Sequence, residues 1–313
     1  MTRTPDARRV LAWDAAAPVL DRRRFLALGS ALVALSCGAG AARPKQRARV
    51  RKCLKLSMVH GEASLEEKFR LLVELGFEGV EVESPSDLDP DEVIAARDAS
   101  GLAVPGVIDS VHWRVPLGDP DPAVRAEGRA GLERALADAA RFGASTVLLV
   151  PAVVNARTAY DVAWENSRSE IGRVLPLAEE LGVRIAIENV WNHFILSPLE
   201  AVRYVDSFES EWVGWYLDVG NVLTYGWPEQ WVRILGKRLL RVDVKEFSRK
   251  KRDSEGLGKG FDVPLGEGDV DWSAVMAALD ALDYDGWGSA ELPGGDADHL
   301  RDVSRRMDDV LAR

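Results

Sequence analysis

Eight short apolar runs alternate along this chain with segments of helical spacing, and this alternation restricts the fold more than any other feature. The runs cover residues 53–59, 77–84, 102–113, 145–153, 183–190, 212–220, 239–247 and 286–292. Strands separated by helices pair in parallel through right-handed crossovers, and eight such units close into a barrel within about 250 residues. We therefore expect a single-domain (β/α)8 TIM barrel over residues 53–313. An open doubly wound sheet is the alternative, but no G-x-G-x-x-G motif follows the first run to support nucleotide binding.

The first 42 residues have the composition of an export signal. Arg22 and Arg23 precede Phe25, Leu26 and an apolar stretch about as long as a signal h-region, and residues 39–42 are small. This segment resembles a twin-arginine translocation signal; a basic N-terminus without a targeting role is the alternative. We expect the mature protein to be periplasmic or extracellular.

Two further expectations concern the same end of the chain. Residues 43–52 should form a linker between the signal and the barrel. The apolar stretch is too short and too rich in Gly and Ala for a stable membrane span. Ala34 and Leu35 fit a lipid-attachment signal poorly, so no lipid anchor is expected at Cys37.

Four of the later runs carry an acid at or near their ends: Glu188, Asp218, Asp243 and Glu291. An unpaired acid would be costly on a strand buried in a parallel sheet. In a closed barrel the C-terminal ends of the strands meet at one mouth, where a divalent cation would reduce the repulsion among four carboxylates. Oxygen-only ligands favour Mn²⁺ or Mg²⁺ over Zn²⁺. For each acid taken alone, the alternative is a helix N-cap or a solvated strand end.

Other residues near these ends are candidates for contact with a small molecule. Alternation along the seventh run puts Lys245 on the face of Asp243, one layer nearer the mouth. The alternative is that Lys245 only offsets the charge of Asp243. The remaining candidates lie at or after strand ends: His112, Trp113, Trp191, His193 and Arg249. The histidines could instead be hydrogen-bonded rim residues, and the arginine could belong to a solvated basic loop.

Several segments carry a family resemblance through their order and spacing. They are GFEGVEVES, DPDPAVRAEGRAGLERALADAARFGASTVLLVP, VRIAIENV, WYLDVGN, RVDVKEF, VPLGEGDVDW and AELP. Across nearly all of residues 53–311 the chain resembles the xylose isomerase-like TIM-barrel superfamily of sugar isomerases and epimerases. In ketose epimerases of that superfamily, residues of the fifth to eighth strands bind one divalent metal. The resemblance implies that role for Glu188, Asp218, Asp243 and Glu291.

Two positions depart from the pattern of the epimerases. Asp243 stands where they usually have a metal-binding His, and Asn221 stands where they have a His that touches substrate. Xylose isomerase itself uses an all-carboxylate site, so the first change is compatible with a metal. The second leaves Asn221 as a candidate substrate contact, and the identity of the substrate does not carry over.

The resemblance implies proton transfer next to a carbonyl, through a metal-stabilised enediolate. Glu188 and Glu291 lie on strands that are not adjacent, so one could remove a proton and the other return it. We therefore expect a sugar epimerase or isomerase. Export favours a free sugar, a keto-sugar or a derivative over a phosphorylated sugar, and the same site could instead cleave a 3-keto-glycoside.

Two other classes remain as alternatives. Family-two AP endonucleases share the barrel, but they need a His-rich metal cluster and a basic surface, whereas this chain has four His and a formal net charge of -10. A nucleic-acid partner is therefore not expected. A non-catalytic carbohydrate-binding barrel would have no need of both Glu188 and Glu291, although Asn221 is compatible with it. A homo-oligomer is compatible with the sequence.

Overall fold

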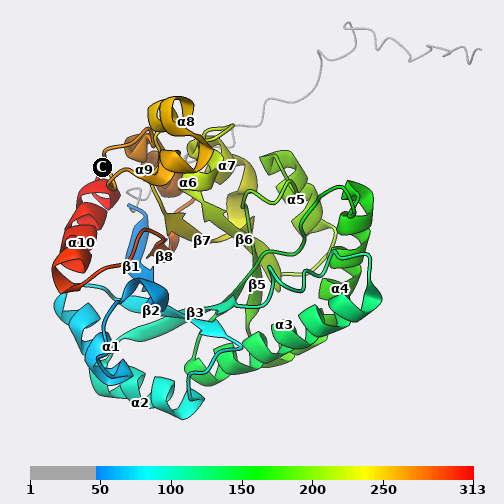
Figure 1. Cartoon of the computed structure of the whole chain (residues 1–313), viewed down its shortest axis with the longest axis horizontal. Helices are drawn as coiled ribbons and strands as arrows, with labels where there is room; N and C mark the ends of the chain where they lie inside the picture. The colour runs from blue at the N-terminus through cyan, green and yellow to red at the C-terminus, as the bar shows by residue number, and fades with distance from the viewer. Residues whose placement is uncertain (1–46) are drawn as a thin grey trace, which may run out of the picture. The chain divides into compact units, whose positions relative to one another are not determined.

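The computed structural model describes residues 47–313, which form a closed barrel of eight parallel strands (Figure 1). Each strand pairs with the next one along the chain, and β8 closes the barrel against β1. The expected (β/α)8 architecture is confirmed. The strands are β1 (Arg49–Lys55), β2 (Gly79–Ser84), β3 (Ala103–Asp109), β4 (Thr146–Leu149), β5 (Arg184–Glu188), β6 (Val213–Asp218), β7 (Leu239–Val244) and β8 (Asp285–Ala290).

Helices surround this barrel (Figure 1). Among residues 47–313 no helix combines the length and the apolar character needed to cross a bilayer. The α-helices are α1 (Leu65–Glu74), α2 (Pro90–Ser100), α3 (Pro122–Phe142), α4 (Tyr160–Leu181), α5 (Pro198–Asp206), α6 (Val219–Val222), α7 (Pro228–Leu235), α8 (Arg249–Glu255), α9 (Trp272–Ala281) and α10 (Ala297–Leu311). Three 3-10 segments complete the set: η1 (Leu56–Met58), η2 (Gly236–Arg238) and η3 (Leu257–Phe261).

Local sequence signals set the helix ends. At the start of α1, Ser64 Oγ accepts a hydrogen bond from the Glu67 amide, and the Glu67 carboxylate accepts one from the Ser64 amide at 2.8 Å. Helices α3 and α4 end at Gly143 and Gly182, whose φ angles of 76° and 67° lie in the left-handed region that glycine adopts most easily.

The start of the barrel differs from the expectation. Strand β1 begins at Arg49, so the last part of the expected 43–52 linker belongs to the barrel, and the first strand starts before Cys53. The charged residues at the start of this strand have partners in the barrel: Arg51 forms an ion pair with Asp285 of β8 at 2.8 Å. The twin-arginine-like segment and Cys37 lie outside the described residues.

The main hydrophobic core lies between the strands and the helices, whereas the inside of the barrel is largely polar. Trp215 of β6 is fully buried, and its ring centroid lies 6.0 Å from that of Trp231 on α7. The neighbouring residues Tyr216 and Asp218 point into the barrel, where they meet polar side chains of other strands. The polar side chains that can carry chemistry therefore lie inside the barrel.

Candidate active site

Four carboxylates meet at one end of the barrel. Glu188 ends β5, Asp218 ends β6, Asp243 is the next-to-last residue of β7, and Glu291 directly follows β8. One oxygen from each residue lies within 4.8 Å of an oxygen from every other. The C-terminal ends of neighbouring parallel strands bring the four side chains together, as their positions in the sequence suggested. Whether they bind a metal stays a prediction.

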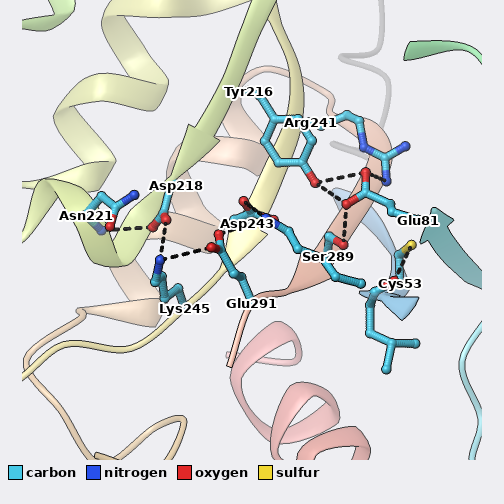
Figure 2. A network of polar contacts seen from close by, with 12 residues as sticks. Cys53, Glu81, Tyr216, Asp218, Asn221, Arg241, Asp243, Lys245, Ser289 and Glu291 are labelled. Carbon is cyan, nitrogen blue, oxygen red and sulfur yellow. Dashed lines mark hydrogen bonds and ion pairs between the residues drawn. The ribbon is translucent and has the colours of Figure 1, made fainter. Parts of the chain in front are cut away.

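Two lysines lie among these acids. Lys245 Nζ is 3.1 Å from Asp218 Oδ2 and 3.3 Å from Glu291 Oε1, as Figure 2 shows. Lys55 Nζ is 3.1 Å from Asp243 Oδ2 and 2.9 Å from Glu291 Oε2. Four carboxylates and two ammonium groups leave the fully ionised cluster with a net charge of about -2, which one divalent cation would neutralise.

Lys55 is a site residue that the sequence analysis missed. With the first strand expected at residues 53–59, Lys55 lies inside the strand and not at its end. In the structure β1 ends at Lys55, which gives this lysine the same strand-end position as the acids. A strand start near Arg49 would have identified it.

Burial and mutual repulsion control the protonation of the cluster. Burial and the nearby charge of Glu291 raise the pKa of Glu188 to about 8. Burial also raises the pKa of Asp218 to about 6, against the opposing charge of Lys245, and it raises that of Asp243 well above its usual value. Burial acts in the same direction on Glu291, but there Lys55 and Lys245 outweigh it and hold the pKa below its ordinary value.

The cluster has features that fit a cation. Its ligand atoms are all carboxylate oxygens, a set that suits hard divalent ions. Asp243 is fully buried, and its Oδ1 atom has no hydrogen-bond partner within the described residues. A buried carboxylate oxygen is rarely left without a partner, so this atom has capacity for a ligand.

The end of β6 is held by two asparagines. Asn189 accepts a hydrogen bond from the Asp218 amide at 3.0 Å and donates one to the Asp218 carbonyl at 2.8 Å. Asp218 Oδ1 accepts from the Asn221 amide at 2.8 Å, so this acid also caps the short helix α6. The Asn221 side chain donates to the Asn189 carbonyl at 3.0 Å. The backbone amide of Asn221 therefore orients Asp218, and a direct contact of the Asn221 side chain with substrate stays a prediction.

A layer of buried polar residues supports the site from below. The layer comprises Cys53, Glu81, Tyr216, Arg241 and Ser289 (Figure 2). Arg241 forms an ion pair with Glu81 at 3.0 Å, and Tyr216 and Ser289 donate hydrogen bonds to Glu81 at 3.0 Å and 2.8 Å. Tyr216, Arg241 and Ser289 each precede a site acid by two residues, so they face inward one layer deeper.

A cavity of about 390 Å³ opens beside Glu188 and Glu291. His112 and Trp113 line it, as expected for a pocket wall, together with Ser57, Glu83 and Ser110, which the sequence analysis missed. Burial and the charge of Lys55 lower the pKa of His112 to about 3, so this imidazole is neutral near pH 7. A second cavity of about 240 Å³ also borders Glu291 and is lined by Lys245.

Besides Asn221, three predicted substrate contacts do not line these two cavities. Trp191 donates to the Asn221 carbonyl and packs against Phe261, with ring centroids 4.8 Å apart. His193 is exposed, and its Nδ1 lies 3.3 Å from the Val154 carbonyl oxygen. The Arg249 guanidinium donates to the carbonyls of Leu223 and Gly226. In this conformation all three bind other parts of the protein.

Glu246 fixes the long polar segment after β7 and was also missed. Its carboxylate accepts hydrogen bonds from the Gly266 amide at 2.8 Å, the Val270 amide at 3.1 Å and Trp272 Nε1 at 3.1 Å. A side chain at Gly268 would collide with this carboxylate. Glu246 therefore anchors the loop that leads from η3 to α9 beside the second cavity.

Comparison with known proteins shows similarity in sequence as well as in fold. A family model described as xylose isomerase-like TIM barrel matches residues 69–309. The putative L-ribulose-5-phosphate 3-epimerase SgbU of Escherichia coli (strain K12) is 29% identical over 203 residues, which cover 62% of this chain and 68% of that protein. The L-ribulose-5-phosphate 3-epimerase UlaE of Salmonella paratyphi C is 28% identical over 268 residues, covering 79% and 91% of the two chains.

Solved structures share the fold at lower identity. The apo 3-keto-D-glucoside 4-epimerase YcjR of E. coli superposes with a TM-score of 0.70 at 19% identity, over 85% of this chain and all of that one. The IOLI protein, whose structure holds a zinc atom, gives 0.69 at 17% identity over 84% and 98% of the two chains. Because the family model covers most of the chain and the barrel is closed, this protein belongs to the xylose isomerase-like TIM-barrel family.

Proposed function

We propose that this protein is a divalent-metal-dependent sugar epimerase or isomerase that moves a proton at a carbon next to a carbonyl. One observation carries the proposal: four carboxylates from consecutive strand ends place oxygens within 4.8 Å of one another beside an open cavity. The relatives SgbU and UlaE, which are named as sugar-phosphate 3-epimerases, support the reaction class.

Glu188, Asp218, Asp243 and Glu291 would hold the cation, with Mn²⁺ or Mg²⁺ favoured by their oxygen ligands. A bound divalent ion supplies Lewis-acid polarisation of a carbonyl and its neighbouring hydroxyl. Lys55 and Lys245 keep the apo cluster from strong self-repulsion through their contacts of 2.9–3.3 Å.

Glu188 and Glu291 would move the proton. Glu188 is buried and lines the larger cavity, and Glu291 borders both cavities. They lie on β5 and β8, two strands that are not neighbours in the barrel, so they can reach a sugar carbon from different sides. One carboxylate would take the proton, and the other would return a proton to the enediolate.

Proton exchange with solvent tests this proposal. The Mn²⁺-loaded protein is incubated in D₂O with D-psicose, L-ribulose and L-ribulose 5-phosphate, and deuterium is followed by NMR. We expect deuterium next to the carbonyl of at least one sugar, and a loss of exchange of about 100-fold or more in Glu188→Gln and Glu291→Gln. No exchange with any sugar, by a folded protein with bound metal, would contradict the proposal.

We also propose export by the twin-arginine route, on the basis of Arg22, Arg23 and the apolar stretch after them. The test is a cell fractionation of the full chain beside an Arg22→Lys/Arg23→Lys variant. Export of the parent and retention of the variant would support the route. Equal distribution of the two would overturn it.

A further inference from the structure

The wall of the larger cavity carries an acid that the proposed reaction does not use. Glu83 lies on the same face of β2 as the buried Glu81, one layer nearer the mouth. Glu83 lines the cavity, and its side chain is exposed. Its carboxylate forms no hydrogen bond or ion pair with any residue of the described part of the chain.

The other groups on this wall are suited to hydroxyl groups. Ser57 supplies a side-chain hydroxyl, Ser110 Oγ donates to the Pro85 carbonyl and can still accept, and Trp113 supplies an aromatic ring that is 53% exposed. A carboxylate, hydroxyls and an exposed ring can accept and donate to a neutral polyol and pack on its apolar face. Glu83 accepts only, so it pairs well with sugar hydroxyls and repels an anion.

The positively charged side chains near the site already have partners within the protein. The lysines that line the two cavities beside Glu291 are Lys55 and Lys245, and each contacts two carboxylates at 2.9–3.3 Å. His112 is neutral, and Arg249 donates to backbone carbonyls. A phosphate ester is normally bound by charge-assisted donors, and these walls offer none that is uncommitted.

We infer that Glu83 selects an unphosphorylated sugar by accepting its hydroxyl groups and repelling phosphate esters. This inference rests on the proposed function and deepens it, because it names the substrate class that the same site takes. It separates this chain from its relatives that are named for L-ribulose 5-phosphate.

The test compares kcat/KM for deuterium exchange with L-ribulose, D-psicose and L-ribulose 5-phosphate. The proteins are the Mn²⁺-loaded parent, Glu83→Gln, Glu83→Lys and the control Glu92→Gln, which changes an exposed acid on α2. We expect the parent to favour a free ketose over the ester by at least tenfold. Glu83→Gln should raise KM for the free ketose about tenfold with little change in kcat. Glu83→Lys should reduce the preference for the free ketose over the phosphate ester.

The other outcomes separate the two proposals. Faster exchange with the ester in the parent, or a KM in Glu83→Gln equal to that of Glu92→Gln, would overturn the role of Glu83 and leave the proposed function intact. Exchange with none of the three sugars would overturn the proposed function and, with it, this inference. Metal content and the unfolding temperature show that each variant is folded and loaded.

Discussion

Lys55 Nζ lies 3.1 Å from Asp243 Oδ2, across the barrel interior from β1 to β7 with β8 between them. Asp243 is the acid that stands where epimerases of the family usually have His, and Lys55 offsets the additional negative charge. Burial opposes a charged lysine here, but the charge of Asp243 and the other acids raises the pKa of Lys55 well above its usual value. The pair therefore keeps the overall charge of the cluster suited to one divalent cation.

Removal of Lys55 should weaken the apo protein and tighten metal binding. In Lys55→Met the free energy of unfolding without metal should fall by about 3 kcal/mol, because buried carboxylates lose their counter-charge. The affinity for Mn²⁺ should rise about tenfold, or about 1.4 kcal/mol, when measured by calorimetry.

Lys52→Met is the matched control for that variant. Lys52 lies on the same strand and has the same 9% exposure, but its ammonium group contacts Ser304 and Asp308 on the outer side of the barrel. Its loss should leave the Mn²⁺ affinity unchanged. An equal or weaker affinity in Lys55→Met would show that Lys55 is not the counter-charge of the metal site.

Metal affinity should depend on pH between about 6 and 8. Without metal, the pKa of Asp218 is raised to about 6 and that of Glu188 to about 8, so Glu188 is mostly protonated at pH 7. A carboxylate must lose its proton to bind the ion, so affinity should increase as pH rises through this range and then level off. Calorimetry at pH 7 in buffers of different ionisation enthalpy should detect proton release. A flat affinity without proton release would contradict this expectation.

Asp109 should make the protein less stable as pH rises. Its carboxylate is fully buried at the end of β3, and burial raises its pKa from 3.8 to about 7. Between those values the unfolded chain is ionised and the folded chain keeps its proton, so stability falls as pH rises and levels off above about 7. From pH 5 to pH 8 the loss due to Asp109 is about 3 kcal/mol.

Urea unfolding of the parent and Asp109→Asn at pH 5, 6, 7 and 8 checks this contribution. As pH rises, the free energy of unfolding of Asp109→Asn should increase relative to that of the parent. A difference that stays constant across this range would show that Asp109 does not titrate with a raised pKa.

Glu81 and Arg241, the buried ion pair below the site, should contribute to the free energy of unfolding through their interaction with each other. Glu81→Leu and Arg241→Met each leave a charge without its partner inside the barrel, so each should cost about 3 to 5 kcal/mol. The double variant should cost clearly less than the sum of the single costs, because neither charge remains. Strict additivity in a double-mutant cycle of urea unfolding would contradict a direct interaction between these two residues.

The barrel and the acids could be predicted because both follow from the chain's repeating pattern. Strand periodicity located the ends of β5 to β8, and parallel topology placed Glu188, Asp218, Asp243 and Glu291 at one mouth. The sequence also identified Lys245 and His112, although not the contacts that hold them.

What could not be predicted depends on strand bounds and on three-dimensional neighbours. Lys55 was missed because charged residues before Cys53 hid the start of β1. Glu83 was missed because β2 has charged residues at both Glu81 and Glu83, and nothing in the sequence distinguishes the buried one from the one that faces a cavity. The Arg249 side chain binds backbone carbonyls more than 20 residues earlier in the chain, and no local sequence pattern indicates these contacts.

The most direct test of the central claim is the metal content of the purified protein after equilibration with Mn²⁺ and removal of free ion. Parent, Asp218→Asn, Asp243→Asn and the control Asp87→Asn, which changes an exposed acid before α2, are compared by elemental analysis. We predict about one Mn²⁺ per chain in the parent and the control, and loss of the metal in the two site variants. A parent that retains no metal, or site variants that retain as much as the control, would contradict the claim that these acids form a metal site.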